Sequence, residues 1–517
     1  APDIWFLIIL MLLVCYGLVM LFSAGYAVAL YRRGDAYTYI RPQLLFAAFG
    51  AAAMYAASLV DYHIWHKLAW PIMGVSLALL AIVLFMPEYN GCKRWIVLPG
   101  LGTLQPSEIA KFAVVLVFAH IISLNHDRMQ TFATGVLPFM VILGAVTVLM
   151  LLEPHLSGTL LILGIGAVLM FVGGTGLKWF ALAGIAGAGA IAAAVVLLPE
   201  LVPYAMGRLS SWRDPFADPL GEGHQTIQSL YAIASGGAAG LGLGNSRQKY
   251  LYVPEPQNDF IFSILCEELG FIGAVICMGL FAALIIQGVI IALNSPDYFG
   301  TMLGIGIMSQ ITWQTMIHIA VVTNVAPNTG ISLPFFSSGG TSLLILLCEM
   351  GIILSISRAG NAQNAARSKR SHEELARRIR KMKEQGTHLC CSIGFLTEKQ
   401  ARMLREAGLD RINHNLNSSR SYYHNICSTH TFEQRVQNIR MLQGIGFEIC
   451  SGGIIGMGES KEDVVDMLLE LREIQPEALP INFLLPIKGT PLGDADISML
   501  TTEYCMKVLC LERLLVP

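Results

Sequence analysis

The residues best suited to chemistry lie in the stretch 250–270, where a polar loop with two prolines runs directly into a long apolar segment. Glu255 and Asp259 stand at this junction, and Glu267 and Glu268 follow inside the apolar segment. Ionisable side chains at membrane depth are expensive, so they indicate either a function or a specific buried partner. A carboxylate at a membrane surface, such as Asp259, can act as a general base. We expect Glu255 to support it, and Glu267 and Glu268 to be structural partners.

Three further segments carry polar chemistry, and the first is residues 91–111. It contains a Lys-Arg-Trp triplet before a Gly/Pro turn, and then Gln105 to Glu108, a pattern typical of a helix start. Glu108 and Lys111 are spaced i, i+3 and can pair on one helix face. The triplet alone could be an interfacial anchor. With Glu and Lys at the start of the same span, a function is favoured.

The second segment is the loop 200–259, which is long enough to be a lid or a site. Its glycine-rich part, GGAAGLGLGNS, is a weak phosphate-loop signal because the Lys-Ser/Thr ending is absent. Tight packing or re-entrant backbone is the other interpretation. Arg247 and Lys249 follow it and modestly favour anion binding. The loop is also expected to have a small core of its own, formed by Trp212, Phe216, Ile227, Leu230, Tyr231 and Ile233.

The third segment, residues 324–342, breaks the helical pattern with two prolines and three glycines. It is either a connecting turn or irregular backbone that lines a cavity, which is tolerated at membrane depth only where protein or water satisfies it. Ser337 and Ser338 are its candidate substrate contacts. A further interruption, Glu153-Pro154-His155, separates two apolar runs, and a lone histidine at such a place is more often structural than catalytic.

The composition places all of these residues in a membrane protein. Charged residues make up 14% of the 517 residues and hydrophobic residues 54%, whereas soluble domains average about 25% charged. The eleven scattered cysteines are interpreted as reduced or buried in lipid. Before residue 358 we expect an all-α polytopic domain of about ten transmembrane helices, near 4–24, 42–60, 68–86, 107–124, 134–152, 157–173, 178–198, 260–293, 300–322 and 340–358, with the first a retained span rather than a signal peptide.

The orientation of these spans rests on two opposing signals. An even number puts both termini on one side, and the basic residues Arg367, Lys369 and Arg370 after the last span indicate the cytoplasm. The short loops then place more cations outside than inside. Either the topology is inverted, or the outer cations have a function that overrides the usual charge bias. We favour the second interpretation, because such a cluster beside a membrane suits a substrate that carries pyrophosphate.

Residues 1–358 resemble the SEDS family, which comprises the FtsW, RodA and SpoVE proteins, in motifs that occur in order along the whole domain. They are GCKRWI, LQPSEIAK, LLEPHLSGT, RLSSWRDPFADPLGEGHQTIQSLYAIASGG, GLGLGNSRQKYLYVPEPQNDFIFSILCEELG and GISLPFFSSGGTS. The tryptophan and Asp-Pro repeats of the long loop, with the glycine-rich segment after them, favour the FtsW and SpoVE side over RodA.

The resemblance implies a multi-pass peptidoglycan glycosyltransferase of the bacterial cytoplasmic membrane, with both termini cytoplasmic. It would polymerise lipid II into glycan strands during division, elongation or sporulation. Its expected partners are lipid II, the growing strand, membrane lipids and a class B penicillin-binding protein, and not nucleic acid. The family motif E-P-x-x-D-F places the key acid on Asp259, and G-x-x-R-W places a functional pair on Arg94 and Trp95. One departure is Glu153-Pro154-His155, where many members have Gln-Pro-Asp.

Such a reaction needs a base for the attacking hydroxyl and cations for the departing pyrophosphate. Asp259 and Glu255 are therefore the expected catalytic acids, and they could also bind a divalent cation, Mg²⁺ or Mn²⁺. A lipid II translocase and a non-catalytic scaffold for a penicillin-binding protein are the alternatives. A transporter might show inverted repeats, and none is convincing, whereas a scaffold would not need acids and cations together. The expected substrate-binding residues are Arg94, Trp95, Gln105, Ser107, Glu108, Lys111, Arg208, Arg247, Lys249, Ser337 and Ser338.

Beyond a basic linker, 359–370, residues 371–517 alternate short strands and helices, which predicts part of a parallel α/β barrel of the TIM type. Phrases such as EICSGGIIGMGES resemble an internal piece of biotin synthase, a radical-SAM enzyme. The cluster motif C-x-x-x-C-x-x-C of that family is not in the sequence. We therefore expect a truncated segment with no iron–sulfur cluster, no SAM and no biotin synthase activity. Its vestigial site positions are Cys391, Cys450, Asn413, Asn415 and Asn417.

Overall fold

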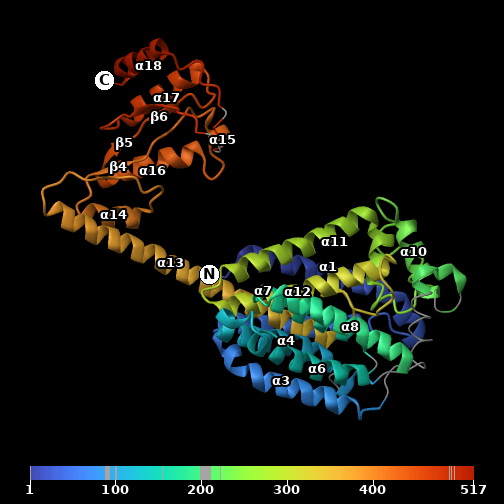
Figure 1. Cartoon of the computed structure of the whole chain (residues 1–517). Coiled ribbons are helices and arrows are strands. Elements are labelled where there is room, and N and C mark those ends of the chain that lie inside the picture. The colour runs from blue at the N-terminus through green and yellow to red at the C-terminus, as the bar shows by residue number, and fades with distance from the viewer. Residues whose placement is uncertain are drawn as a thin grey trace. The chain divides into compact units, whose positions relative to one another are not determined.

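The structure, a computed structural model, describes residues 2–87, 93–98, 102–153, 155–197, 211–219, 221, 223–487, 490, 492–493 and 495–516. The chain divides into two compact units, Ala1–Gln363 and Asn364–Pro517. Each unit has a hydrophobic core of its own. The first unit is mostly helical, whereas the second alternates helices with strands (Figure 1).

The first unit consists of long apolar helices, which satisfy their own backbone hydrogen bonds as hydrocarbon requires. In the described part of the chain, eight helices are long and apolar enough to cross a membrane, and Leu156–Val172 and Leu177–Gly187 are shorter apolar helices. Together they agree with the prediction of about ten. The helices are α1 (Ile4–Arg33), α2 (Ile40–Leu59), α3 (His63–Val83), α4 (Pro106–Asn125), α5 (Phe132–Gly135), α6 (Leu137–Leu152), α7 (Leu156–Val172), α8 (Leu177–Leu197), α10 (His224–Gly236), α11 (Ile261–Leu293), α12 (Tyr298–Val322) and α13 (Gly340–Lys383).

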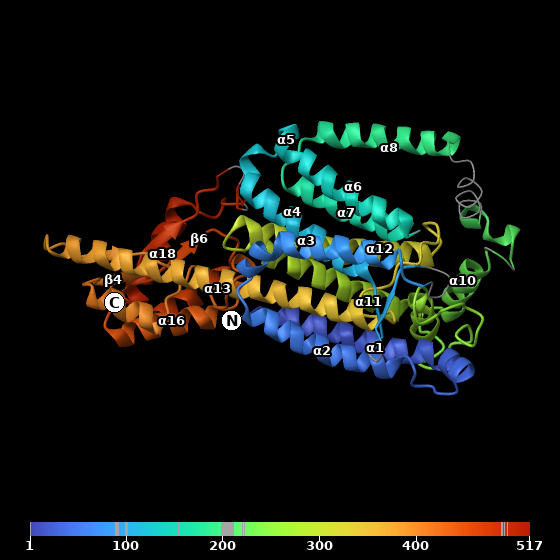
Figure 2. The same ribbon diagram turned by 90° about the horizontal axis from the view of Figure 1, so that it is seen from below.

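Helices α4 and α12 lie in the interior of the first unit. Helix α4 packs against α3, α7 and α12, and α12 also packs against α7 and α11. Helices α1 and α11 run side by side through the bundle (Figure 2). Large apolar side chains of the outer helices are exposed, for example Phe49 on α2 and Ile82 on α3. Such surfaces are stable in lipid rather than in water.

Helix α11 is opened at Gly270, where the backbone has φ 66° and ψ −166°. The glycine-rich segment fits against this opening, since the N–H of Leu241 donates to the carbonyl of Glu267 at 2.9 Å. A Cβ on Gly240 would lie 2.2 Å from the carbonyl oxygen of Glu268. Only glycine permits so close an approach. The tight-packing interpretation of this segment is therefore confirmed.

The rest of the long loop differs from its prediction. Ile227 is buried, but Phe216 and Tyr231 are 55% and 49% exposed. The prediction that they belong to a separate core of this loop was therefore wrong. Instead, α10 packs against α11, and the indole of Trp212 donates to the carbonyl of Asn324 at 3.1 Å. An antiparallel hairpin of β1 (Ile96–Leu98) and β2 (Gly102–Leu104) follows the Lys-Arg-Trp triplet and was not anticipated.

Helix α13 continues without interruption from the first unit into the second. The predicted linker 359–370 lies inside this helix, and the boundary between the units, at residue 363, falls within it. The reason is local, because this segment contains four Ala and three Lys or Arg residues, which favour a helix, and no proline. The rise in charge at residues 359–370 therefore does not coincide with the end of a helix.

The second unit has the predicted alternation of strands and helices. Strands β3, β4 and β5 pair in parallel in that order, and β6 pairs in parallel with β7. Side-chain capping boxes begin α14, α16 and α17 at Thr397, Thr431 and Ser460. The elements are β3 (Cys390–Cys391), α14 (Glu398–Glu406), β4 (Arg411–Asn413), α15 (Tyr423–Ile426), α16 (Phe432–Ile445), β5 (Glu448–Cys450), β6 (Gly453–Ile455), α17 (Lys461–Ile474), β7 (Ile481–Phe483) and α18 (Thr502–Leu515).

A glycine on α1 permits the close approach of the segment 324–342. A Cβ on Gly17 would lie 2.3 Å from the carbonyl oxygen of Phe335. We therefore expect Gly17→Ala to destabilise the protein by about 1–3 kcal/mol and to lower its unfolding midpoint in detergent. The matched control is Gly144→Ala on α6, because a Cβ at Gly144 meets nothing within 4 Å. Equal midpoints for the two variants would contradict this assignment.

Candidate active site

Asp259 lies two residues before α11 and is partly buried. A Cβ built on Gly330 would be 3.4 Å from its Oδ2 atom, so the segment 324–342 covers this carboxylate. Burial and the negative charge of Glu255 raise the pKa of Asp259 to about 6, and the positive charge of Arg94 opposes them. A carboxylate with this pKa is mostly ionised at neutral pH and is a better base than an exposed one.

Glu255 is fixed by three donors. Its carboxylate accepts from Arg32 Nη1 at 2.7 Å, from Gln257 Nε2 at 2.7 Å and from Asn258 Nδ2 at 3.2 Å. Its backbone has φ 49°, a left-handed conformation that non-glycine residues rarely adopt. Strain of this kind is typical of functional loops. Arg32, at the end of α1, was not among the predicted site residues.

The side chain of Arg94 contacts the backbone that follows α6. Its Nε atom donates to the carbonyl of Glu153 at 3.4 Å. Burial raises the pKa of Glu153 to about 8, against the charge of Arg94. Burial, with the charges of Arg94 and Lys111, lowers the pKa of His155 to about 3. Glu153 and His155 are therefore mainly uncharged at neutral pH, whereas Asp259, which also interacts electrostatically with Arg94, is mostly ionised.

The start of α4 forms a buried polar group. Lys111 Nζ and Glu108 Oε1 lie 2.8 Å apart with both side chains almost fully buried, as their spacing predicts. Glu108 also accepts from the hydroxyl of Ser342 at 2.9 Å, which links α4 to α13. Ser107 is buried, and its hydroxyl has no hydrogen-bond partner in the described part of the chain. Gln105 precedes the helix but its side chain does not cap it.

Lys249 does not face the outer surface with the other predicted cations. It is buried and pairs with Glu268 at 2.8 Å. The free N–H groups of the loop also have an internal acceptor, since those of Arg247 and Gln248 donate to the carboxylate of Glu267 at 3.0 and 3.2 Å. The protein's own acids thus occupy the positions where a phosphate loop would hold its anion. Glu267 and Glu268 are structural partners, as predicted.

The other predicted contacts are distributed around Asp259. The hydroxyl of Ser337 donates to the carbonyl of Asn258 at 2.7 Å, and the N–H of Ser338 donates to the carbonyl of Gln257 at 2.9 Å. Trp95 is half-buried beside β1, and the side chain of Arg247 is exposed. Arg208 lies outside the described residues. Gln43, which sequence reasoning missed, donates to the carbonyl of Ser337 at 3.4 Å and fixes this segment from α2.

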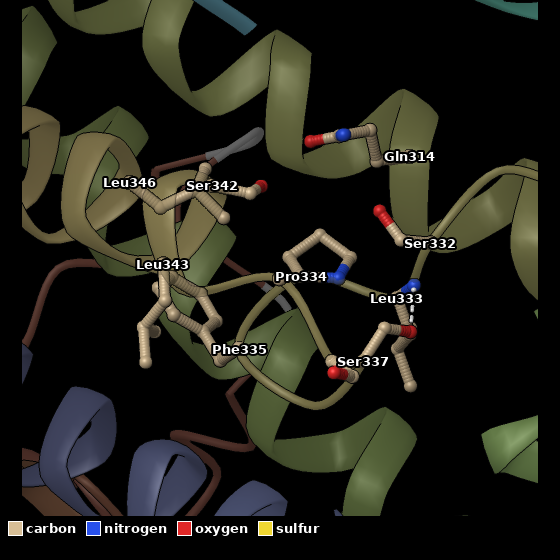
Figure 3. Close-up of a pocket in the computed structure, with 11 residues that line it drawn as sticks. Gln314, Ser332, Leu333, Pro334, Phe335, Ser337, Ser342, Leu343 and Leu346 are labelled. Carbon is tan, nitrogen blue, oxygen red and sulfur yellow. Dashed lines mark hydrogen bonds between the residues drawn. The ribbon is translucent and has the colours of Figure 1, made fainter. Parts of the chain in front are cut away.

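A pocket opens next to this segment, between α12 and the start of α13 (Figure 3). Ser332, Ser337 and Ser342 give it polar walls, and Leu343 and Leu346 give it an apolar wall. Of the two interpretations of residues 324–342, the structure therefore favours irregular backbone that lines a cavity. The segment connects Asp259 to Glu108, because it contacts both.

Three of the vestigial positions of the second unit, Cys391, Asn413 and Cys450, lie on three neighbouring strands. Cys391 pairs with Ile412 across β3 and β4, and Cys450 pairs with Asn413 across β4 and β5. No group of three or more His, Cys, Asp or Glu residues that could hold a metal occurs among the described residues. The backbone of Asn417 has φ 72°, and the amide oxygen of Asn415 accepts from the N–H of Gly452 at 3.2 Å. These side chains therefore do not fit an iron–sulfur cluster.

The fold and the site define a polytopic membrane protein with a half-enclosed carboxylate, Asp259, within electrostatic reach of Arg94. The family model described as "Cell cycle protein", which covers FtsW, RodA and SpoVE, matches residues 3–362, and the chain belongs to this family. A model described as "Radical SAM superfamily" matches residues 335–471. The predicted family and the mostly helical membrane fold with a radical-SAM-like C-terminal piece are thus confirmed.

Three relatives illustrate the similarity. Stage V sporulation protein E of Bacillus subtilis is 40% identical over 364 residues, 69% of this chain and 97% of that protein. A probable peptidoglycan glycosyltransferase FtsW of Geobacter sp. (strain M18) is 36% identical, over 69% of this chain and 96% of its own length. A solved structure described as "Structural coordination of polymerization and crosslinking by a peptidoglycan synthase complex" has 30% identity and a TM-score of 0.58, over 70% of this chain and 98% of that one.

The buried pair Lys249–Glu268 supports a stability prediction. Removal of one partner leaves an uncompensated buried charge, so we expect Lys249→Met to cost about 3–5 kcal/mol. The exposed pair Arg32–Glu255, whose side chains are 51% and 38% exposed, is the control. Arg32→Ala should cost at most about 1 kcal/mol. Unfolding midpoints in detergent measure both, and an equal loss in the two variants would contradict the assignment.

Proposed function

We propose that this chain is a peptidoglycan glycosyltransferase that polymerises lipid II at the outer face of the cytoplasmic membrane. The observation that carries the proposal is Asp259, a half-enclosed carboxylate whose pKa is raised to about 6 and which lies within the electrostatic reach of Arg94. The names of the relatives, peptidoglycan glycosyltransferase among them, support the same activity. The fold places this carboxylate where the long loop meets the start of α11.

In this mechanism Asp259 accepts the proton of the attacking sugar hydroxyl as the new glycosidic bond forms. As the anomeric C–O bond breaks, its electron pair stays on the departing pyrophosphate, which gains a negative charge beyond the two that it already carries. Arg94, which lies within electrostatic reach of Asp259, would stabilise this charge. Glu153 and His155 do not oppose this step, because their pKa shifts keep both side chains mainly neutral at pH 7. Lys111 acts indirectly, since its ion pair with Glu108 orients the start of α4.

Glu255 and Asp259 also fit a divalent cation, Mg²⁺ or Mn²⁺. Magnesium is commonly held by one or two carboxylates together with substrate phosphates, and the described residues offer no larger group of ligands. When bound, the ion would neutralise charge on the departing pyrophosphate. The exposed side of Glu255 leaves room for such a ligand, although Arg32 competes for the same carboxylate.

The partner and the orientation follow from the same proposal. A class B penicillin-binding protein would cross-link the glycan strands that this chain makes. The description of the similar solved structure, which names polymerization and crosslinking by one peptidoglycan synthase complex, supports this proposal. Both termini would be cytoplasmic, since the basic residues after the last span favour that side. The subtype that acts in division, elongation or sporulation is a finer assignment, and the FtsW-like and SpoVE-like motifs favour division or sporulation over elongation.

Loss of the base should abolish synthesis. We expect Asp259→Asn to reduce the polymerisation of purified lipid II by at least about 10²-fold, the lower range for general-base catalysis, with the chain still folded and inserted. A size-exclusion profile in detergent and the unfolding midpoint serve as controls. Full activity of this variant would contradict the mechanism. If the wild-type protein moves lipid II across vesicle membranes but makes no polymer, the result would support a translocase. If it shows neither activity, the result would support a scaffold.

The acidic limb of the pH profile should report on Asp259. A base must be deprotonated to act, so the rate should rise with pH and level off above about 6. Because the charge of Glu255 raises the pKa of Asp259, Glu255→Gln should move this limb to lower pH, whatever it does to the maximal rate. Polymerisation rates between pH 4.5 and 8 measure the shift. A limb that stays in place or moves upward would exclude Asp259 as the titrating group.

We propose that the second unit is an inactive radical-SAM-like domain. After anaerobic reconstitution with iron and sulfide, we expect no 4Fe–4S absorption band and no cleavage of SAM, because the cluster motif C-x-x-x-C-x-x-C is not in the sequence and a cluster needs about four ligands. Lipid II polymerisation should be the same with and without residues 384–517. A stable cluster that cleaves SAM would overturn this assignment.

A further inference from the structure

Two histidines on neighbouring helices form a cluster of metal-ligating side chains outside the proposed active site. His66 lies in the first turn of α3 and His120 lies near the end of α4, and these two helices pack against each other. The Nδ1 atoms of the two rings are 2.9 Å apart. His120 follows Glu108 by twelve residues along α4, which is roughly 18 Å of helix. The pair is therefore well separated from the groups around Asp259.

The hydroxyl of Ser123 determines the tautomer of His66. Ser123 Oγ donates its single proton to the carbonyl of His120 at 2.8 Å. In its contact with His66 Nε2, at 3.3 Å, the hydroxyl must therefore accept, so this ring nitrogen carries the proton. In the neutral ring, Nδ1 of His66 is then a free lone pair beside His120. One nitrogen that donates to a neighbour and one that is left free is the arrangement of a histidine that binds a metal.

The contact between the two rings is bent. Their centroids are 4.3 Å apart and their planes lie at 65° to each other, whereas an in-line N–H···N bond would hold the centroids farther apart. Bent hydrogen bonds are weak. A cation at about 2.0–2.1 Å from each nitrogen would see two atoms 2.9 Å apart at an angle of about 90°. This is the angle between neighbouring ligands in tetragonal and octahedral complexes.

Both rings are accessible to water. His66 and His120 are half-buried rather than enclosed, and the side chains of Lys67 and Asp127, next to the pair along α3 and just beyond α4, are exposed. The ring of Phe299 covers one side of His66, with the two centroids 4.4 Å apart. A hydrated cation could therefore reach the pair from the open side and keep water in its remaining positions.

The protein would supply two ligands to such a cation. The nearby His63 is already held between Asp61 and Asp297, at 2.6 and 3.1 Å. Among the described residues there is no group of three or more His, Cys, Asp or Glu side chains that could hold a metal. Imidazole ligands suit Ni²⁺, Cu²⁺ and Zn²⁺, whereas Mg²⁺ and Mn²⁺ prefer oxygen. The chemistry of this pair thus differs from that of the carboxylates at Asp259.

The geometry points to His66 and His120 as a binding site for a divalent transition-metal cation of the Ni²⁺ or Cu²⁺ type, which would cross-link α3 to α4. On binding, His120 moves its proton from Nδ1 to Nε2 through water, so that both Nδ1 atoms coordinate and the neutral rings lose no proton. Water completes the coordination. The site is independent of the proposed polymerase function.

The test measures the binding of Ni²⁺ alone to the full chain, purified in detergent without a histidine tag. Because the chain has 12 His and 11 Cys residues, the comparison is between wild type and His120→Gln. We expect this variant to bind Ni²⁺ at least about tenfold more weakly, since loss of an outer-shell partner alone costs roughly 10–100-fold. It should also lose the rise in unfolding midpoint that Ni²⁺ causes in the wild type. Any effect of Mg²⁺ should be the same in both proteins.

The matched control is His126→Gln. His126 lies at the same end of α4, but it is exposed and contacts Asp127 at 3.2 Å, so its variant should bind Ni²⁺ like the wild type. If His120→Gln fails to fold, His66→Gln replaces it. A measurement on the wild type needs no variant, because Ni²⁺ should protect His66 and His120 from carbethoxylation, as read by mass spectrometry.

A selective loss of Ni²⁺ binding in the pair variant, or selective protection of the two rings, supports the site. Unchanged binding in the pair variant, an equal loss in His126→Gln, or absence of protection overturns it. The two histidines would then be a structural hydrogen bond between α3 and α4. None of these results bears on polymerisation by Asp259.

Discussion

The arrangement of the site depends on two buried carboxylates, Glu267 and Glu268. A buried charge must be paired and hydrogen-bonded, and these two obtain their partners from the loop that leads to Asp259. Lys249 pairs with Glu268, Ser23 of α1 donates to the same carboxylate at 2.7 Å, and the loop N–H groups donate to Glu267. Two segments, this loop and α1, are thereby fixed to α11. Asp259 lies between this anchored loop and the start of α11.

The segment 324–342 forms another side of the site around Asp259. It approaches Asp259 through Gly330 and leads into α13, where Ser342 contacts Glu108. The N-terminal ends of α4, α11 and α13 are thereby brought together. Such contacts would be unfavourable in lipid unless they were mutually satisfied.

The sequence was sufficient for the features that depend on local spacing. Asp259 at a loop–helix junction, the pair Glu108–Lys111 and the alternating strands of the second unit follow from short-range patterns. It was not sufficient where the partner is remote, as for Lys249 with Glu268 or Arg32 with Glu255, because no local pattern specifies which buried charge meets which. The catalytic and substrate-binding roles themselves stay predictions. The uninterrupted α13 was missed because charge was given more weight than helix propensity.

The contact between Gly17 and Phe335 also constrains how this protein can evolve. The two residues lie on separate segments, yet the left-handed backbone of Phe335 persists only while position 17 has no side chain. A larger residue at position 17 becomes tolerable only after the turn has changed its conformation, because the atom it would meet is a backbone oxygen that any residue at position 335 carries. The constraint therefore falls on position 17, which should stay glycine among homologous sequences that keep this turn.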